Sequence, residues 1–432
     1  MSSLGRPALD WLVDRDATDD SPWLYGGRAG VALGLLEGYL ALGDDRYAVA
    51  ALRNARTLRA VDATDYSLYF GLTGVAYALH MVGSLLDDPA SSAAARRSLD
   101  QVRTAFDGER WSEAFELLAG NAGIALAALQ MGDPELAVLA ASPYLRRAEP
   151  TPAGVNWEHR TGATSRLHHI SHGTLGISYA PASVGHTAGR PDFVDLALAG
   201  VADVVSRDEA GPSGFLVRHS DPQWRPTVIE PYSYGWCHGP AGDAQVFRLL
   251  AEVTGDPSWA ALISRCWHTV THSGLPQRLR PGFWDNSGRC CGTAGVLALA
   301  CDLGDLDFAR VLVDDIEARA RPEASGVSWS NFEHRVTPSD LPPEPGWAMG
   351  NAGIARELLR YDRLLTGGRR DYYVPWPDQT PISGDRVAVG DVRRATGDGQ
   401  GVTGDGRRAT GDGQGVTGDG RWATGDGRRP TS

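Results

Sequence analysis

The sequence predicts an all-α protein, a double-layered α,α-toroid in which seven helical hairpins surround a central cavity. Three observations predict this fold. A short Gly-x-x-Gly motif occurs seven times, a uniformly apolar run follows each copy, and a run with amphipathic spacing separates successive copies. No segment has a convincing strand pattern. Alternating buried and amphipathic helices in repeated pairs are typical of a closed two-layer helical ring.

The seven motifs are spaced regularly along most of the chain. The interval between first glycines ranges from 44 residues, between Gly27 and Gly71, to 66 residues, between Gly173 and Gly239, and each interval fits a helical hairpin. One copy could serve packing alone, but seven copies indicate a structural repeat. The glycine pairs are Gly27 and Gly30, Gly71 and Gly74, Gly120 and Gly123, Gly173 and Gly176, Gly239 and Gly242, Gly292 and Gly295, and Gly350 and Gly353.

The predicted helices are of two kinds. Residues 31–36 and 124–129 follow two of the motifs and are apolar nearly all round, so their helices must be buried on most faces. These are inner helices. Residues 45–59 and 192–206 place apolar side chains three and four apart with charges elsewhere, as outer helices do. The glycines stand at the inner-helix entrances, where a missing Cβ lets a neighbouring backbone approach.

The predicted domain organisation has three parts. Residues 1–20 form a lead-in, residues 21–372 form the toroid, and residues 373–432 form a Pro-rich linker and a tail. Three prolines between residues 375 and 381 interrupt helix formation, and from Arg394 the chain repeats units such as ATGDGQG and VTGDGRR. Because this tail has almost no apolar content to offset the entropy of ordering, we predict that residues 385–432 are disordered.

Composition excludes several classes of protein. The formal net charge of -12 argues against a nucleic-acid partner, which would require a basic face. We find neither a signal peptide nor an apolar run long enough to span a bilayer, so we expect a cytoplasmic protein without an integral membrane segment. Five cysteines, odd in number and crowded into one region, make a poor disulfide framework and indicate free thiols. They are Cys237, Cys266, Cys290, Cys291 and Cys301.

Three of these cysteines stand directly before Gly-x-x-Gly motifs. Cys237 lies in GWCHG, Cys290 and Cys291 lie in RCCG, and His172 has a matching place in ISHG. Equivalent positions of the repeats face the same end of a toroid, so we expect these side chains to converge. Three thiolates with an open fourth position suit a catalytic Zn²⁺, and helix N-termini favour the thiolate form. We predict one zinc ion per chain, bound by Cys237, Cys290 and Cys291.

Each of the five cysteines, and also His172, has a purely structural interpretation. Free cysteine is among the most buried residue types. We prefer that interpretation for Cys301, which lies within the apolar run LALACDLG, and for Cys266, which lies on an amphipathic outer helix. The corresponding interpretation of His172 is a hydrogen-bonded structural histidine.

The seven motifs, the WCHG segment, the later CCG segment and the mid-chain SHG segment resemble the lanthionine synthetase C family over about residues 20–365. The resemblance implies an α,α-toroid with a single zinc ion, bound by the cysteine of the first segment and two neighbouring residues of the next. Most members have Cys-His in that later pair, where this chain has Cys290-Cys291. A three-cysteine subset is known within the family, so the change does not abolish the site.

The resemblance also implies roles for residues around the metal. His172 matches the family's catalytic histidine, a general acid or base, and Glu116 stands where the family often has Asp. Ser233 replaces an Arg that bacterial cyclases commonly have four residues before the first zinc cysteine. Trp236 is expected to line the cavity, and His238 to make a supporting hydrogen bond rather than bind the metal.

The implied function is lanthionine or methyllanthionine formation, in which a peptide Cys thiolate adds to dehydroalanine or dehydrobutyrine. The implied partners are a leader-bearing precursor peptide and a separate dehydratase, because the chain has no evident dehydratase, kinase or lyase region. The segment WCHGPAG resembles the eukaryotic LanC-like branch more closely than the bacterial cyclases. Members of that branch bind glutathione, so a glutathione-adding protein is a second candidate.

Three further classes of protein stay open. A zinc-stabilised, non-catalytic peptide-binding scaffold is kept open by Ser233. A prenyltransferase-like barrel would normally mix Asp, Cys and His ligands. A carbohydrate-active α/α barrel would need paired cavity carboxylates, and the motif entrances offer only Glu116.

Overall fold

A computed structural model describes residues 4–14, 21–227, 229–279, 286–330 and 342–379. The chain divides into two compact units, Met1–Thr396 and Gly397–Ser432. The second unit lies outside the described residues, as does the whole segment 385–432 that we predict to be disordered. The described residues contain fourteen α-helices and three two-stranded sheets.

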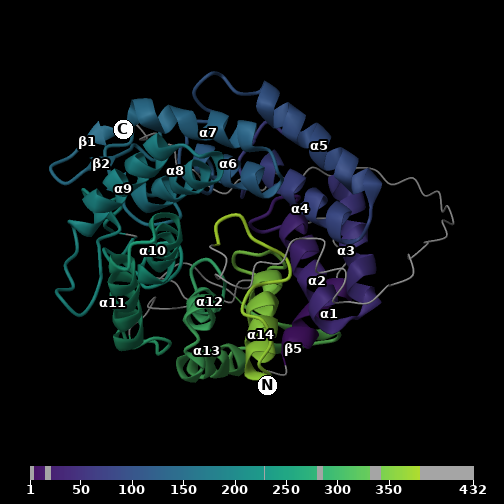
Figure 1. Cartoon of the computed structure of the whole chain (residues 1–432). Helices are drawn as coiled ribbons and strands as arrows, with labels where there is room; N and C mark the ends of the chain where they lie inside the picture. Colours follow the sequence, from purple (N-terminus) through teal and green to yellow (C-terminus); the bar gives the residue numbers. More distant parts are fainter. Residues whose placement is uncertain (1–3, 15–20, 228, 280–285, 331–341, 380–432) are drawn as a thin grey trace, which may run out of the picture. The chain divides into compact units, whose positions relative to one another are not determined.

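Seven inner helices form a closed ring within the first unit (Figure 1). Each contacts the next inner helix along the chain, and the last closes on the first. The predicted all-α toroid is therefore confirmed. The inner helices are α2 (Arg28–Leu42), α4 (Leu72–Leu85), α6 (Asn121–Gln130), α8 (Thr174–Ala188), α10 (Pro240–Thr254), α12 (Thr293–Leu303) and α14 (Asn351–Leu365).

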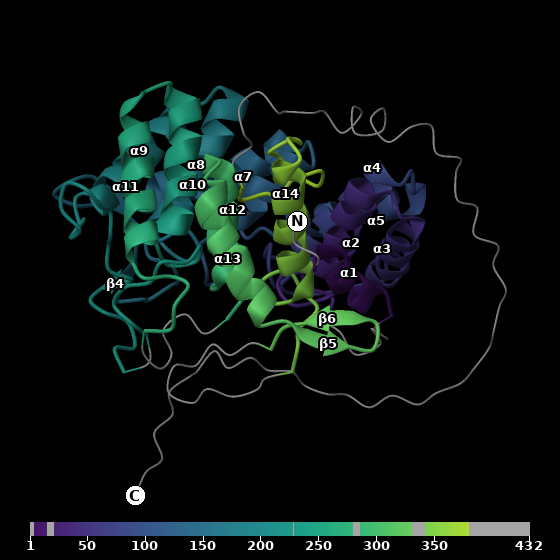
Figure 2. The same ribbon diagram turned by 90° about the horizontal axis from the view of Figure 1, so that it is seen from below.

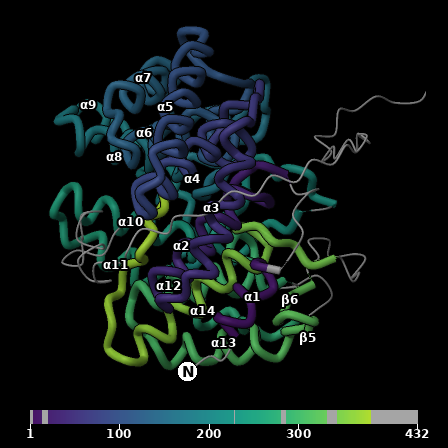
Figure 3. The backbone as a smooth tube through the Cα atoms, turned by 90° about the vertical axis from the view of Figure 1, so that its right-hand side faces the viewer, coloured from purple at the N-terminus to yellow at the C-terminus, as the bar shows by residue number. Residues whose placement is uncertain are grey.

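Each inner helix carries one outer helix against it. Six outer helices directly follow their inner partner in the sequence. Two of them, α3 (Asp45–Leu58) and α9 (Pro191–Val205), match the predicted runs 45–59 and 192–206. The seventh, α1 (Gly5–Asp14), packs beside α14, the last inner helix (Figure 3). The segment 1–20, expected to be a lead-in, therefore supplies an outer helix. The others are α3 (Asp45–Leu58), α5 (Pro89–Thr104), α7 (Pro134–Arg147), α9 (Pro191–Val205), α11 (Ser258–His272) and α13 (Leu306–Ala318).

Local sequence explains the sharp turns from inner to outer helices. At four of them a glycine ends the inner helix in the left-handed region, as Gly43 does with φ of 65° and Gly304 with φ of 76°, where a Cβ would be unfavourable. After Gly43 and Gly304 the next residue is an aspartate that caps the outer helix: Asp44 accepts the N–H of Arg46, and Asp305 accepts that of Phe308. The Gly-Asp pair thus both stops one helix and starts the next.

None of the described helices is long and apolar enough to cross a membrane.

The strands are short and belong to the connections between helices. All three strand pairs are antiparallel, and the last lies against α1 (Figure 2). The pairs are β1 (Glu149–Pro150) with β2 (Val155–Asn156), β3 (Arg166–Leu167) with β4 (Ser220–Asp221), and β5 (Arg321–Glu323) with β6 (Gly326–Ser328).

The chain remains in the toroid beyond residue 372. Residues 372–379, here called the strap, are not helical, yet Val374, Trp376 and Asp378 are buried. The part of the predicted linker that the structure describes, residues 373–379, is therefore packed against the ring. Proline interrupts a helix, but it does not prevent burial when other side chains bind the backbone.

Candidate metal centre

Each inner helix is entered through a tight loop that its Gly-x-x-Gly motif makes possible. A Cβ on the second glycine would lie 1.8 Å from the carbonyl oxygen of Trp236 at Gly242, and 2.0 Å from that of Leu68 at Gly74. No side chain can be accommodated at such distances, so the loop backbone folds directly onto the first helical turn. The residues just before each motif are thereby held at the helix entrance.

A ring of backbone hydrogen bonds joins these entrance loops. The residue two places before the first glycine donates its N–H to the carbonyl of the equivalent residue in the next loop, as Cys237 does to Cys290 at 3.2 Å. Cys237 and Cys290 are thus adjacent, equivalent members of one ring. The other five bonds run from Tyr25 to Tyr69 (3.0 Å), Tyr69 to Leu118 (3.1 Å), Ser171 to Cys237 (3.2 Å), Cys290 to Ala348 (2.8 Å) and Ala348 to Tyr25 (2.9 Å).

The three predicted metal ligands come together at this ring. The sulfur of Cys291 lies 3.1 Å from that of Cys237 and 3.5 Å from that of Cys290, and all three lie within 4.8 Å of one another. Within the part of the chain that the structure describes, they are the one group of three such metal-capable side chains. We call them the thiol cluster. Cys266 and Cys301 lie separately in the core.

The donor set of the thiol cluster fits zinc. Cys237 and Cys290 are buried and Cys291 is partly exposed, so the group has a protected side and an accessible side. Three sulfur donors suit a tetrahedral soft or borderline metal, and the remaining position could receive a substrate. The residues present could therefore hold one Zn²⁺.

The thiols of Cys290 and Cys291 differ in how readily they lose a proton. Hydrogen bonds from the thiols of Cys237 and Cys291 lower the pKa of Cys290 well below its ordinary value, and the hydroxyl of Tyr25 adds to this effect. Hydrogen bonds with Cys237 and Cys290, followed by burial, raise the pKa of Cys291. One thiolate therefore forms readily in the cluster, and binding of a dication would favour loss of the remaining thiol protons.

His172 lies in the entrance loop next to that of Cys237 and pairs with Glu116. The Nδ1 atom of His172 lies 3.2 Å from Oε1 of Glu116, and the His172 side chain is 34% exposed. Burial alone would lower the pKa of His172, but the charge and hydrogen bond of Glu116, together with the charge of Cys290, raise it overall. His172 can therefore hold a proton close to the thiol cluster.

Glu116 replaces the seventh bond of the backbone ring. Leu118 is the ring residue of the third loop, and its N–H donates to Oε2 of Glu116 at 2.6 Å. The N–H of Ala119 donates to the other oxygen at 3.1 Å. The carboxylate is thus held by two backbone donors and faces His172, so the ring is interrupted where the His172–Glu116 pair lies.

His238 is placed by its neighbours rather than among the thiols. Its Nε2 atom lies 3.5 Å from Oγ of Ser171, which donates to the carbonyl of Cys237 at 2.7 Å. The His238 ring lies 5.5 Å from that of His172 and 4.1 Å from that of His219. Burial, with these histidines, holds the pKa of His238 well below its ordinary value. His238 is therefore a neutral neighbour of the cluster.

The remaining predicted residues, Trp236 and Ser233, closely precede Cys237 in the chain. Trp236 is 1% exposed and meets Trp347 edge-on, with ring centroids 5.6 Å apart. It therefore packs among other aromatic side chains, and its expected place in the lining of the cavity stays a prediction. Ser233 lies in the turn before the motif, where its hydroxyl accepts the N–H of Gly235 at 3.5 Å.

Two neighbours of the site are not identified by the sequence reasoning. Tyr25 occupies in the first motif the same place as Cys237 and Cys290, two residues before the first glycine, so alignment of the seven motifs could have found it. His219 directly precedes β4, and no local pattern indicates that its ring reaches His238.

Comparison with known proteins decides the family. The family model described as "Lanthionine synthetase C-like protein" matches residues 18–225 and 221–317. This chain belongs to the lanthionine synthetase C-like family. Among solved structures, this LanC-like chain is similar to "Nisin cyclase", with a TM-score of 0.57 and 15% identity over 82% of this chain and 91% of that chain. That similarity is one of fold.

Other solved structures match the LanC-like chain at lower TM-scores, and no curated protein sequence matches it. A cellobiose 2-epimerase from Bacillus thermoamylovorans B4167 has a TM-score of 0.45 and 10% identity, over 62% of this chain and 85% of that chain. An unsaturated glucuronyl hydrolase specific for heparin has a TM-score of 0.46 and 13% identity, over 84% of this chain and 96% of that chain. We draw no functional conclusion from either.

Proposed function

We propose that this LanC-like protein is a zinc-dependent cyclase that closes lanthionine or methyllanthionine rings in a dehydrated precursor peptide made by a separate dehydratase. The observation that carries the proposal is the convergence of three thiols beside the His172–Glu116 pair. Cys237, Cys290 and Cys291 would hold one zinc ion. When bound, zinc would favour the thiolate form of a substrate cysteine at neutral pH.

The reaction forms one C–S bond and is balanced without a co-reactant. The substrate sulfur adds to the β-carbon of dehydroalanine or dehydrobutyrine, and the electron pair of the double bond moves toward the carbonyl to give an enolate. That enolate takes a proton at the α-carbon. The proton lost from the thiol and the proton gained at carbon cancel, so the protein needs only to position and transfer them.

His172 is the residue suited to deliver the proton. Glu116 raises its pKa and engages Nδ1, so the proton that reaches the substrate would be carried on Nε2. Glu116 itself is 3% exposed and is held by two backbone N–H groups. We assign it the role of fixing the imidazole orientation and keeping His172 protonated.

A ring-closure assay tests the proposed function. The zinc-loaded protein is incubated with a dehydrated, leader-bearing peptide, and free cysteines are then alkylated and counted by mass spectrometry. We expect cysteines to become resistant to alkylation with the wild type and with Cys301→Ala, but not with Cys237→Ala. Zinc and peptide binding without any loss of alkylatable cysteine would favour a non-catalytic scaffold. A glutathione adduct in place of a ring would favour a glutathione-adding protein.

A further inference from the structure

The strap lies against the inner helices although it has no regular structure of its own. Its backbone is bound by side chains from three of these helices. Glu37 on α2 accepts the N–H of Val374 at 2.7 Å, and Arg356 on α14 donates to the carbonyl of Val374 at 2.7 Å. Tyr77 on α4 donates to the carbonyl of Pro375 at 2.6 Å. These contacts replace the hydrogen bonds that a helix would have made.

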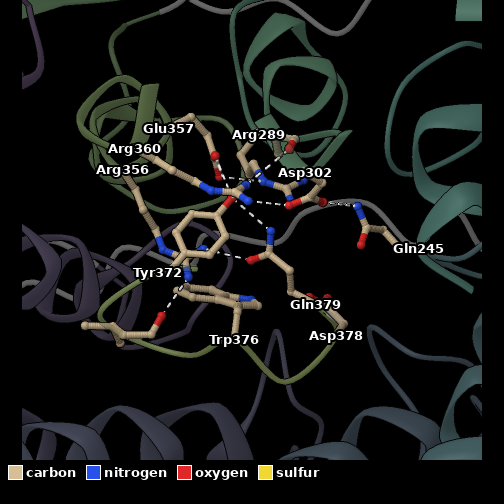
Figure 4. A network of polar contacts seen from close by, with 12 residues as sticks. Gln245, Arg289, Asp302, Arg356, Glu357, Arg360, Tyr372, Trp376, Asp378 and Gln379 are labelled. Carbon is tan, nitrogen blue, oxygen red and sulfur yellow. Dashed lines mark hydrogen bonds and ion pairs between the residues drawn. The ribbon is translucent and has the colours of Figure 1, made fainter. Parts of the chain in front are cut away.

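The strap side chains belong to a buried polar network (Figure 4). The hydroxyl of Tyr372 donates to Glu357 at 2.6 Å, and it accepts from Gln379 at 2.8 Å and from Arg360 at 2.9 Å. Arg360 also pairs with Asp302. Buried charges are costly unless they are paired, and the strap together with Asp302 and Arg289 supplies partners for the charged residues of the inner helix α14.

Aromatic contacts lead from the strap to the thiol cluster. Trp376 stacks on Trp347, with ring centroids 4.8 Å apart and an interplanar angle of 15°. Trp347 in turn meets the ring of Trp236 at 5.6 Å and 88°, and Trp236 directly precedes Cys237. The loop of Trp347 also accepts the N–H of Cys290 at 2.8 Å. Trp376 is thus two packed rings away from the loop of the first thiol.

A second route runs through Tyr69. Its hydroxyl accepts from the indole N–H of Trp376 at 3.0 Å and donates to the carboxylate of Asp378. The carbonyl of Tyr69 belongs to the backbone ring, where it accepts the N–H of Tyr25 at 3.0 Å. Tyr25 in turn donates its hydroxyl to the thiol of Cys290. Both routes from Trp376 therefore end at the thiol cluster.

We propose that the strap is a positioning element of the metal centre and that it acts through Trp376. The inference rests on the proposed zinc centre. Trp376 fixes Trp347, whose entrance loop is hydrogen-bonded to that of Cys290, and Tyr69, whose entrance loop is hydrogen-bonded to that of Tyr25. Loss of this support would let those loops move relative to one another, so the sulfurs would no longer be held in place before the metal binds.

Titration of the metal-free, full-length protein with Co²⁺ tests the role of Trp376. Trp376→Leu keeps an apolar side chain but removes the stacking and the indole N–H. We expect its Kd for Co²⁺, read from the thiolate-to-cobalt charge-transfer band, to rise at least about tenfold. Trp376→Phe keeps a ring on Trp347 and should restore the affinity to within about threefold of wild type.

A matched control separates positioning from general damage to the core. Trp329 is 1% exposed and Trp376 is 2% exposed, and the indole N–H of Trp329 donates to the carbonyl of Ile316 on the outer helix α13 at 2.8 Å. Trp329→Leu should therefore lose stability but keep its affinity for Co²⁺. Thermal unfolding of each variant, followed by circular dichroism, ensures that all titrations are made on folded protein.

The outcomes are distinguishable. Unchanged Co²⁺ affinity in Trp376→Leu would overturn the proposal, and so would an equal loss in Trp329→Leu. If Trp376→Leu does not fold, Trp376→Met takes its place under the same two criteria. A wild-type protein whose thiols bind no Co²⁺ would refute the zinc centre itself, and with it the proposed function.

Discussion

At the scale of single residues, position in the motif rather than burial distinguishes the thiols of the cluster from other cysteines. Cys290 and Cys301 are similarly buried, at 2% and 0% exposure, but only Cys290 belongs to the backbone ring. We predict that Cys237→Ala and Cys291→Ala lose their zinc because each removes one of three ligands. Cys301→Ala should keep it. Elemental analysis of the purified proteins measures this, and full zinc content in Cys237→Ala would contradict the assignment.

His172 and Glu116 make separable predictions. His172→Ala should keep zinc and the fold but lose roughly a hundredfold in ring-closure rate, the usual size of an acid–base contribution. A ring-closure rate near that of the wild type would indicate that His172 has only a structural role.

Glu116→Gln should act through the pKa of His172. Glu116 raises that pKa, so loss of its charge should lower it, and less of the imidazole would be protonated at neutral pH. The alkaline limb of the rate profile should therefore move to lower pH, while the zinc content stays unchanged. A profile measured with the same peptide for wild type and variant checks this, and an unshifted limb would argue against the pairing.

Asp378 makes stability depend on pH. Burial raises its pKa to about 6, although Tyr69 and Arg289 oppose the change, whereas its usual value is 3.8. The folded state therefore holds this proton more tightly than the unfolded state, so the contribution is present below about pH 4 and is lost as the pH rises through about 6. Asp378→Asn should remove this dependence. Relative to wild type, the variant should gain about 2 kcal/mol between about pH 4 and pH 7, measured by denaturant unfolding. A constant difference would contradict the argument.

At the scale of secondary structure elements, the glycine motifs govern how tightly a loop can close on its helix. A Cβ at Gly74 would lie 2.0 Å from the carbonyl oxygen of Leu68. Relieving this clash would require the backbone of the loop to move, which is costly in free energy. We predict that Gly74→Ala lowers the free energy of unfolding by about 3 kcal/mol.

Gly43 offers a control for that substitution. It has a φ of 65° but no atom within 4 Å of a built Cβ, so Gly43→Ala should cost only about 1 kcal/mol, from backbone strain alone. Chemical denaturation compares the two variants. Equal losses would show that close approach is not the reason for the motif.

At the scale of the whole molecule, two truncations test which part of the C-terminal region supports the ring. A chain ending at residue 384 should melt as the full chain does, because the segment removed has little apolar content. A chain ending at residue 371 would lose the strap. The buried guanidinium of Arg356 would lose its hydrogen bonds to Val374 and Gln379, and Glu37 and Glu357 would keep only their ion pairs with Arg363 and Arg289. This chain should lose at least about 3 kcal/mol. A lowered melting temperature for the first chain, or an unchanged one for the second, would contradict this view.

Local signals in the sequence are enough to predict the repeat and the thiol cluster. Glycine spacing and apolar periodicity are such signals, and a closed ring converts equivalent motif positions into neighbours. For this reason Cys237, Cys290 and Cys291 can be grouped from the sequence alone. The pairing of His172 with Glu116 is not predicted in this way, because the resemblance places each of them singly.

The packing of the strap against the inner helices depends instead on tertiary structure, and so do the contacts that lead from the strap to the thiol cluster. The bond between Glu37 and Val374 spans 337 residues, and neither residue lies in a pattern that indicates the other. In the sequence alone, a charged residue on an inner helix is only an interruption of the apolar pattern, because its partner is not visible. A proline-rich segment in turn has the sequence pattern of a linker. Periodicity reports which face of an element is buried, but partners that are distant in sequence are fixed by the closed ring, which brings α1 and the strap to the same inner helices.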